Sequence, residues 1–241
     1  MRKDNSDNNI KSPLWVLSGY VPNFITSLNL FSGCIGVLLA FQGNYQGAFI
    51  AIMISAVFDF FDGFAARLLN AYSPMGKELD SLADVVSFGV VPGAIVFSLL
   101  SQIAINEWLP YLAFLIPVFS ALRLAKFNID ERQSSSFIGL PTPANAIFWG
   151  GLVYSFSGFL ISNSWLLILL TLIFSYLLVA ELPMFALKFK NFAWKNNQIQ
   201  YLFLIGCVII LAFFQLNAFA ILIGWYILLS IGVSIFKKKL I

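Results

Sequence analysis

Four aspartates lie within or beside long apolar segments of this 241-residue chain: Asp59, Asp62, Asp80 and Asp84. Even a lenient insertion scale assigns a cost of about 2.5 kcal/mol to one charge at the bilayer centre, so these carboxylates need compensating partners. Oxygen ligands suit Mg²⁺ and Mn²⁺ better than zinc. The four residues therefore predict a site for two divalent cations, of the kind used in phosphoryl transfer.

Helical geometry brings these carboxylates together. At about 100° per residue, the residues that share a helical face with Asp59 are Asp62, Gly63, Ala66 and Arg67. Asp80 and Asp84 share a face of the next helix, whereas Glu78 points away. Residues 70–75 form a short turn containing a proline, which predicts that the two helices are antiparallel neighbours.

The residues around the aspartates suit a nucleotide substrate. Gly63, Ala66 and Gly76 would leave space for a nucleotide and its pyrophosphate, and Arg67 would neutralise a phosphate. The alternative is a set of structural aspartates paired with Arg67 and Lys77. The side chains of Arg67 and Lys77 carry only two positive charges and do not neutralise four buried carboxylates, which favours the catalytic interpretation.

The rest of the composition excludes other chemistries. The chain has no histidine, which excludes His metal ligands and Ser-His-Asp catalysis. Cys34 and Cys207 lie singly in apolar runs without metal-ligand spacing. The net charge of +3 comes from residues at membrane edges rather than from a basic stripe, so no nucleic-acid partner is expected. Catalysis must rest on carboxylates.

Hydropathy predicts an all-α polytopic integral membrane protein. Hydrophobic residues make up 60% of the chain and charged residues 10%, with a mean hydropathy of +0.87. Segments of about 20 apolar residues predict eight spans: 23–42, 46–69, 78–101, 108–127, 144–162, 165–187, 199–215 and 218–236. With both termini cytoplasmic, all 14 Lys and Arg residues fall on the inner side, together with the active site. Alternatively, the last two segments form a re-entrant hairpin.

The whole chain, 1–241, is expected to be a single membrane domain. Residues 1–22 would form a cytosolic tail and an interfacial segment, and no cleavable signal peptide is indicated. Within this stretch, residues 15–20 would lie along the membrane surface or simply extend the first span. Residues 23–150 would hold the catalytic helices and the acceptor loop, and 151–241 the additional spans. A basic, aromatic segment at 188–198 is expected to act as an anchor.

The spacing of the motif resembles a known family signature. It reads Asp59-x2-Asp62-Gly63-x2-Ala66-Arg67-x8-Gly76-x3-Asp80-x3-Asp84 and is similar at all eight positions to that of the CDP-alcohol phosphotransferases. The resemblance implies transfer of a phosphoalcohol group with release of CMP. It also implies that the first three aspartates chiefly bind metal, and that Asp84 is both a metal ligand and the general base toward the acceptor hydroxyl.

Further segments resemble the branch of this family that uses L-serine. They are residues 22–29, 76–89, 123–128 and 137–146. The candidate residues for binding CDP-diacylglycerol are Asn23, Thr26, Asp59, Gly63, Ala66, Arg67, Gly76 and Lys77. Asn23 and Thr26 have an alternative role as helix caps.

Candidate acceptor-binding residues lie on the predicted cytosolic side: Arg123, Lys126, Asn128, Arg132, Pro141 and Thr142. Arg123 would bind a serine carboxylate or a lipid phosphate, or else act as a snorkelling anchor at the interface. The Pro-Thr-Pro run at 141–143 has a purely structural alternative as a rigid helix start.

The resemblance therefore implies transfer of a phosphatidyl group from CDP-diacylglycerol to L-serine, with the bilayer as the lipid source. A sibling activity on glycerol 3-phosphate, inositol phosphate or another alcohol is the first alternative. A cation transporter is the second, because intramembrane carboxylates also mark ion routes. A homodimer through the later spans would fit the family.

Overall fold

The computed structural model describes residues 13–103, 106–130, 132, 137–187, 193–194 and 197–238, with side chains described from residue 20 to residue 235. Several residues predicted on the inner side lie outside the described residues: Arg2, Lys3, Lys11, Lys188, Lys190, Lys195 and Lys239. Much of the 188–198 segment does so too. The described part is helical apart from one pair of two-residue strands.

The first two helices form an antiparallel pair. Helix α1 (Pro13–Phe41) turns into α2 (Tyr45–Leu68) through Gly43, which has a φ of +73° that favours glycine. The Asn44 side chain caps α2 by accepting a hydrogen bond from the Gly47 N–H at 2.9 Å. Because α1 is continuous from Pro13, residues 15–20 extend the first helix, as one of the two interpretations predicted.

The third span contains a π-helical turn. It consists of α3 (Pro74–Asp84), the π-helix η1 (Val85–Val90) and α4 (Val91–Ile103). Ser73 caps α3 by accepting from the Gly76 N–H at 2.9 Å, and Pro74 occupies the first turn. The π turn follows directly after Asp84, and such turns are frequent at functional sites.

The next elements take the chain across the bundle three more times. They are the 3₁₀-helix η2 (Leu109–Phe114), α5 (Leu115–Ile129), β1 (Phe137–Ile138), α6 (Thr142–Ser162), α7 (Ser164–Val179) and β2 (Pro183–Met184). The strands pair antiparallel, with Phe137 opposite Met184. Gly139 has a φ of +80°, and a Cβ there would lie 2.4 Å from the Leu178 carbonyl oxygen. The segment before α6 is thus pressed against the end of α7.

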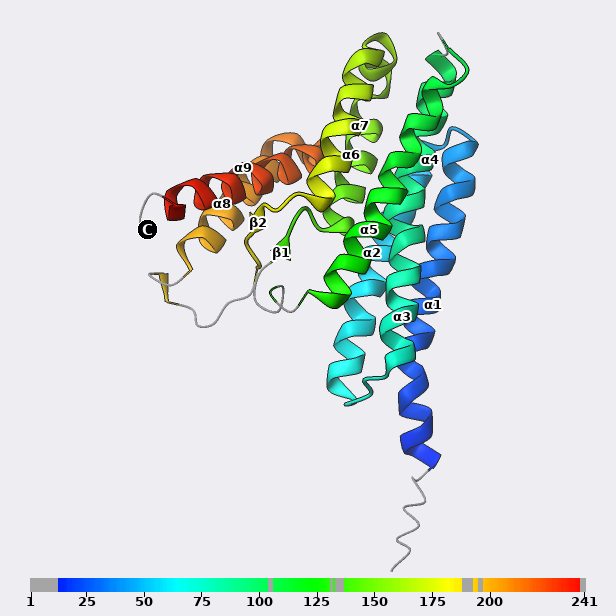
Figure 1. The fold of residues 1–241 in the computed structure, drawn as a ribbon, viewed down its shortest axis with the longest axis vertical. Coiled ribbons are helices and arrows are strands. Elements are labelled where there is room, and N and C mark those ends of the chain that lie inside the picture. Colours follow the sequence, from blue (N-terminus) through cyan, green and yellow to red (C-terminus); the bar gives the residue numbers. More distant parts are fainter. Residues whose placement is uncertain are drawn as a thin grey trace, which may run out of the picture.

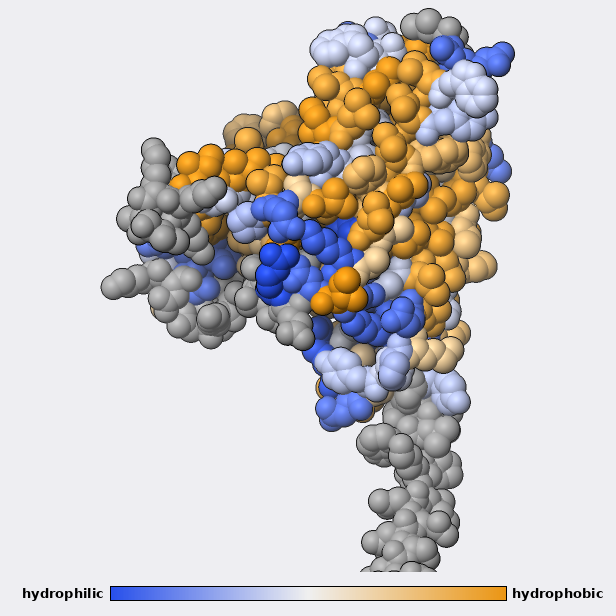
Figure 2. All heavy atoms as spheres, viewed as in Figure 1, coloured by the Kyte–Doolittle hydropathy of each residue, from blue (hydrophilic) through white to orange (hydrophobic). Residues whose placement is uncertain are grey.

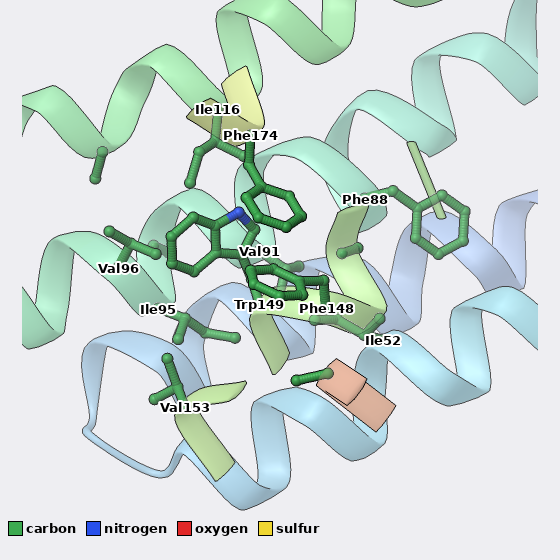
Figure 3. Close-up of a cluster of buried hydrophobic side chains, with 14 of the residues drawn as sticks. Ile52, Phe88, Val91, Ile95, Val96, Ile116, Phe148, Trp149, Val153 and Phe174 are labelled. Carbon is green, nitrogen blue, oxygen red and sulfur yellow. The ribbon is translucent and has the colours of Figure 1, made fainter. Parts of the chain in front are cut away.

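Large side chains fill the centre of the bundle (Figure 3). Trp149 of α6 is fully buried, and the neighbouring Phe148 stacks on Phe174 of α7 with ring centroids 3.7 Å apart. Phe88 and Val91, from the π turn and the start of α4, are also fully buried. This packing holds the helical turn after Asp84 in place.

A helical, polytopic membrane protein is confirmed, but a count of eight spans is not. The described residues contain six stretches long and apolar enough to cross a membrane, one of which joins α8 and α9 over residues 198–235. Helix α7 has 16 residues and is about 24 Å long, shorter than a hydrocarbon core of about 30 Å. The predicted 165–187 segment was too long, because Ala180 has an extended conformation and Pro183 lies in β2.

The last two helices differ from the others in direction. Helix α8 (Gln198–Phe214), the 3₁₀ turn η5 (Gln215–Asn217) and α9 (Ala218–Lys238) form a hairpin that projects sideways, steeply inclined to the bundle (Figure 1). The two helices approach closely, since a Cβ on Gly206 would lie 2.2 Å from the Trp225 Nε1. No residue of α8 is buried.

Candidate functional site

Three of the predicted carboxylates converge between α2 and α3. Asp59, Asp62 and Asp80 each offer a carboxylate oxygen, and these oxygens lie within 4.8 Å of one another. Asp62 is buried, whereas the other two are half-buried. An all-oxygen set of three carboxylates fits a hard divalent cation such as Mg²⁺ or Mn²⁺. Side chains from two antiparallel helices can therefore hold a metal.

Asp84 lies deeper and is held by α1. It is 7% exposed, and its Oδ1 accepts a hydrogen bond from Asn29 Nδ2 at 3.3 Å. The main-chain carbonyl of Asn29 accepts from Ser55 Oγ of α2 and Ser87 Oγ of the π turn, at 3.2 and 3.0 Å. Asp84 is close enough to Asp59 and Asp80 for their charges to repel, so the fourth carboxylate adjoins the metal-binding group. One buried asparagine thus joins three helices beside the fourth carboxylate.

Thr26, a candidate nucleotide ligand, contacts a carboxylate. Its Oγ1 lies 2.7 Å from Asp62 Oδ2 and 3.0 Å from the Pro22 carbonyl oxygen. A hydroxyl has one proton to donate, and the shorter contact is with Asp62. Both Thr26 and Asn23 lie well inside α1, so the alternative that they cap a helix start is wrong.

A cavity of about 620 Å³ lies between α1, α2 and α3 and extends to the 71–74 turn. The predicted site residues that line it are Asn23, Thr26, Asp59, Asp62, Gly63, Ala66, Gly76, Lys77 and Asp80. A Cβ on Gly63 would meet nothing within 4 Å, whereas one on Gly76 would lie 2.9 Å from Asn23 Oδ1. The small residues therefore leave the cavity open on the α2 side and allow close packing of α1 on α3.

Arg67 differs from the other motif residues. It is exposed in the last turn of α2 and is not among the residues that line the cavity. Lys77 does line it, and its Nζ donates to the Asn128 carbonyl oxygen at 3.1 Å. Asn128 in turn donates through Nδ2 to Ser81 Oγ at 2.8 Å. Lys77 and Asn128 thus tie α3 to the end of α5, next to the aspartates.

Arg123 is the buried cation of the site. It is 6% exposed, and its guanidinium carbon lies 5.0 Å from the ring centre of Phe127 and 5.9 Å from that of Phe137. It is attracted electrostatically to Asp84. Its Nε has no hydrogen-bond partner among the described residues. A snorkelling anchor would extend its head group into water, so the interface-anchor interpretation fits poorly.

Lys126 and Arg132 already have acidic partners. Lys126 Nζ forms an ion pair with Glu181, which lies between α7 and β2. Arg132 Nη2 lies 2.7 Å from Asp130 Oδ2 and 3.7 Å from Glu181 Oε2. In Figure 2, hydrophilic residues gather where α5 meets β1 and β2, on an otherwise hydrophobic bundle. These two basic residues are neutralised locally, unlike Arg123.

The Pro-Thr-Pro segment begins α6. Pro141 has an extended conformation, and its carbonyl oxygen accepts from the Asn145 N–H at 3.0 Å. Its structural role as a helix start is therefore present. Thr142 is fully buried, and neither its hydroxyl nor the side-chain amide of Asn145 has a partner among the described residues.

Two important residues were not among the predicted site residues. Asn29 lies in the 22–29 segment, one helical turn after Thr26, so its face on α1 was a usable signal. Glu181 carried no such signal, because its partners Lys126 and Arg132 lie about 50 residues earlier in the chain.

Comparisons with known proteins agree with the resemblance described above. A family model described as CDP-alcohol phosphatidyltransferase matches residues 19–177. Three proteins named CDP-diacylglycerol–serine O-phosphatidyltransferase are similar to the chain. The Bacillus subtilis protein is 40% identical over 128 residues, covering 52% of this chain and 70% of that protein.

The other two relatives match at similar levels. The Mycobacterium leprae protein is 33% identical over 174 residues, covering 68% of this chain and 57% of that protein. The Saccharomyces cerevisiae protein is 38% identical over 151 residues, covering 56% of this chain and 54% of that protein. The chain thus spans a little over half the length of these two relatives.

Proposed function

The chain belongs to the CDP-alcohol phosphatidyltransferase family, and from that premise we propose that it transfers a phosphatidyl group from CDP-diacylglycerol to L-serine. The products would be phosphatidylserine and CMP. The observation that supports this proposal best is a cavity lined by three carboxylates, with Asp84 deeper in the bundle. The buried Arg123 is attracted electrostatically to Asp84, and its Nε has no partner among the described residues. The names of the similar proteins point to the same donor and acceptor.

The carboxylates would hold two divalent cations, Mg²⁺ or Mn²⁺, through Asp59, Asp62, Asp80 and Asp84. The three clustered carboxylates supply oxygen ligands from two helices, and Thr26 orients one of these carboxylates by donating a hydrogen bond to Asp62. When bound, the cations would offset the negative charge of the pyrophosphate and of the departing CMP.

The donor would occupy the cavity between α1, α2 and α3. Gly63, Ala66 and Gly76 keep side chains out of the space that a nucleotide and its pyrophosphate need. Lys77 lines the same cavity, and its charge would help to hold the phosphates. Arg67 would approach the pyrophosphate from the rim of the cavity. The diacyl chains can stay in the bilayer beside the apolar outer surface of the bundle.

Asp84 would be the general base. Its carboxylate would accept the proton of the serine hydroxyl as that oxygen forms a bond to the phosphorus next to diacylglycerol. The bond from this phosphorus to the bridging oxygen would break, and the oxygen would leave with CMP. Asn29 donates to one carboxylate oxygen of Asp84 and leaves the other for the acceptor. Arg123 would bind the serine carboxylate through its unpaired N–H group.

The structure favours this function over the two alternatives on specific grounds. A transporter would need carboxylates along a route across the membrane. Asp59, Asp62 and Asp80 instead line one cavity, which is bordered by the 71–74 turn. A phosphorylated acceptor would need several uncommitted cations. Lys126 and Arg132 are both paired with acidic residues, which leaves Arg123 for a singly charged group.

We propose in addition that the site and both termini face the cytoplasm. Arg67 lies in the last turn of α2, Lys77 in the first turn of α3 and Lys126 in the last turn of α5, which would put all three on the inner side under the positive-inside rule. The segment that contains α7 is the sixth in the predicted topology, so the chain would return to this side at its end, and the α8–α9 hairpin would leave the C-terminus there. Eight spans would require α7, α8 and α9 to cross individually. The homodimer expected from the resemblance is also a prediction.

Release of CMP from purified protein tests the reaction. Protein in CDP-diacylglycerol-containing micelles would be given Mg²⁺ or Mn²⁺ and, in turn, L-serine, glycerol 3-phosphate, inositol phosphate or no acceptor. We expect CMP and phosphatidylserine only with L-serine and a metal, and no turnover with EDTA. CMP release with glycerol 3-phosphate but not with serine would overturn the assignment of the acceptor.

A further inference from the structure

We infer that Glu181 is a specificity-determining residue that excludes phosphorylated acceptor alcohols. It neutralises the basic residues that surround the proposed acceptor site, so that the site attracts a singly charged carboxylate rather than a doubly charged phosphate. The inference rests on the proposed function, and it concerns a residue outside the aspartate motif.

The geometry of the ion pairs supports this role. Glu181 forms an ion pair with Lys126 through one carboxylate oxygen, and its other oxygen lies 3.7 Å from Arg132 Nη2. Arg132 is also held by Asp130, with distances of 2.9 Å from Nε to Oδ1 and 2.7 Å from Nη2 to Oδ2. Glu181 therefore serves two cations from different segments at once.

These ion pairs lie next to the proposed acceptor site. Lys126 follows Arg123 by one turn on α5, so the two side chains are neighbours on the helix surface. Arg123 also packs on Phe137 of β1. Strand β1 pairs with β2, which begins two residues after Glu181. The strand pair therefore brings the segment that follows Glu181 beside the strand on which Arg123 packs.

The balance of charge decides which acceptor fits. Arg123, Lys126 and Arg132 carry three positive charges, and Asp130 and Glu181 carry two negative ones. Glu181 offsets positive charge on Lys126 and Arg132 beside the cation that would receive the single carboxylate of serine. A phosphomonoester carries a charge of about −1.5 to −2 at neutral pH. Without Glu181, the site would gain one unit of positive charge, which would favour a phosphate over a carboxylate.

Glu181 keeps its charge at physiological pH. The hydrogen bond from Lys126 is the main cause of a pKa for the Glu181 carboxyl below its usual value. A carboxyl with a lowered pKa stays ionised throughout the neutral range and loses its charge only in more acidic solution. The pKa of Arg132 is raised, chiefly by its hydrogen bond to Asp130. Glu181 and Arg132 therefore both carry their charges in neutral solution.

The test is the affinity of the purified protein for glycerol 3-phosphate. Equilibrium binding of the radiolabelled compound would be compared between the wild type and Glu181→Gln, with Mg²⁺ present, alongside its inhibition of serine-dependent CMP release. We expect binding to tighten about fivefold in the variant, the upper end of the effect of an exposed charge pair. The difference should shrink as salt is added. Equal binding by the two proteins would overturn the inference.

Two further variants make the result specific. Glu107→Gln removes the same charge at an exposed position between α4 and η2, and it should leave glycerol 3-phosphate binding unchanged. The double variant Glu181→Gln/Lys126→Gln should lose the gain in affinity. Tighter binding of glycerol 3-phosphate by Glu107→Gln would also overturn the inference, and so would tighter binding that persists in the double variant. Failure of the wild type to release CMP with serine would instead overturn the proposed function.

Discussion

The donor and acceptor sides of the proposed site are built in different ways. On the donor side, hydrogen bonds from Thr26 and Asn29 connect α1 to buried carboxylates of α2 and α3. On the acceptor side, the charged side chains of Lys126, Arg132 and Glu181 pair at the surface. Buried hydrogen bonds fix the position of reacting groups, whereas exposed ion pairs can change with little cost to the fold. We infer that the chemistry is held rigidly and that acceptor choice is the adjustable property.

The sharpest test of the rigid side is Asp84→Asn. We expect turnover to fall by about 100-fold or more, the usual scale for loss of a general base. Metal-dependent binding of CDP-diacylglycerol should be retained, because three carboxylates still form the metal group. CMP release and donor binding would be measured on the same preparation. Unchanged turnover would remove Asp84 from the role of base.

Arg123→Lys should have the next largest effect, and it acts on the acceptor side alone. Lysine keeps the charge but not the planar guanidinium that packs on Phe127 and can pair with a carboxylate. We expect KM for serine to rise by about tenfold, with little change in KM for CDP-diacylglycerol. Steady-state rates of CMP release, measured at varied concentrations of serine and of CDP-diacylglycerol, give the two KM values separately. An equal rise in both KM values would argue against a role in acceptor binding.

Asn29→Ala tests whether the buried asparagine positions Asp84. The 3.3 Å hydrogen bond to the carboxylate would be lost, and we expect kcat to fall about tenfold, the scale of a hydrogen bond to a charged group. KM for the donor should change less. Ser55→Ala is the matched control, since Ser55 contacts the carbonyl of Asn29 and not Asp84. An equally large fall in kcat in the control would reduce Asn29 to a packing residue.

Arg67→Gln should have the smallest effect of the four substitutions. Arg67 is exposed and does not line the cavity, so we expect KM for CDP-diacylglycerol to rise only about threefold, as for other exposed charges. The comparison with Lys77→Gln is informative, because Lys77 does line the cavity. Kinetics at low and high salt would show whether either charge acts through screened attraction. A larger rise in KM for CDP-diacylglycerol in Arg67→Gln than in Lys77→Gln would mean that Arg67 moves inward when the donor binds.

Sequence patterns were reliable where they depended on local geometry. The spacing of Asp59, Asp62 and Asp80 placed their side chains on facing helices, and the structure brings their oxygens together. Hydropathy was less reliable for the span boundary near Ala180, because the sequence stays largely apolar there although the helix ends. Hydropathy averages over a window and does not register one residue with an extended backbone.

The sequence by itself determined the membrane class, the helical face of each aspartate and the resemblance to the family. These properties depend on composition and on the repeat of a single helix. Only the tertiary structure decided that Asn29 holds Asp84, that Glu181 neutralises Lys126 and that the α8–α9 hairpin projects sideways. The two side-chain pairings join segments far apart in the chain, and the direction of the hairpin depends, as they do, on how the helices pack rather than on any local spacing.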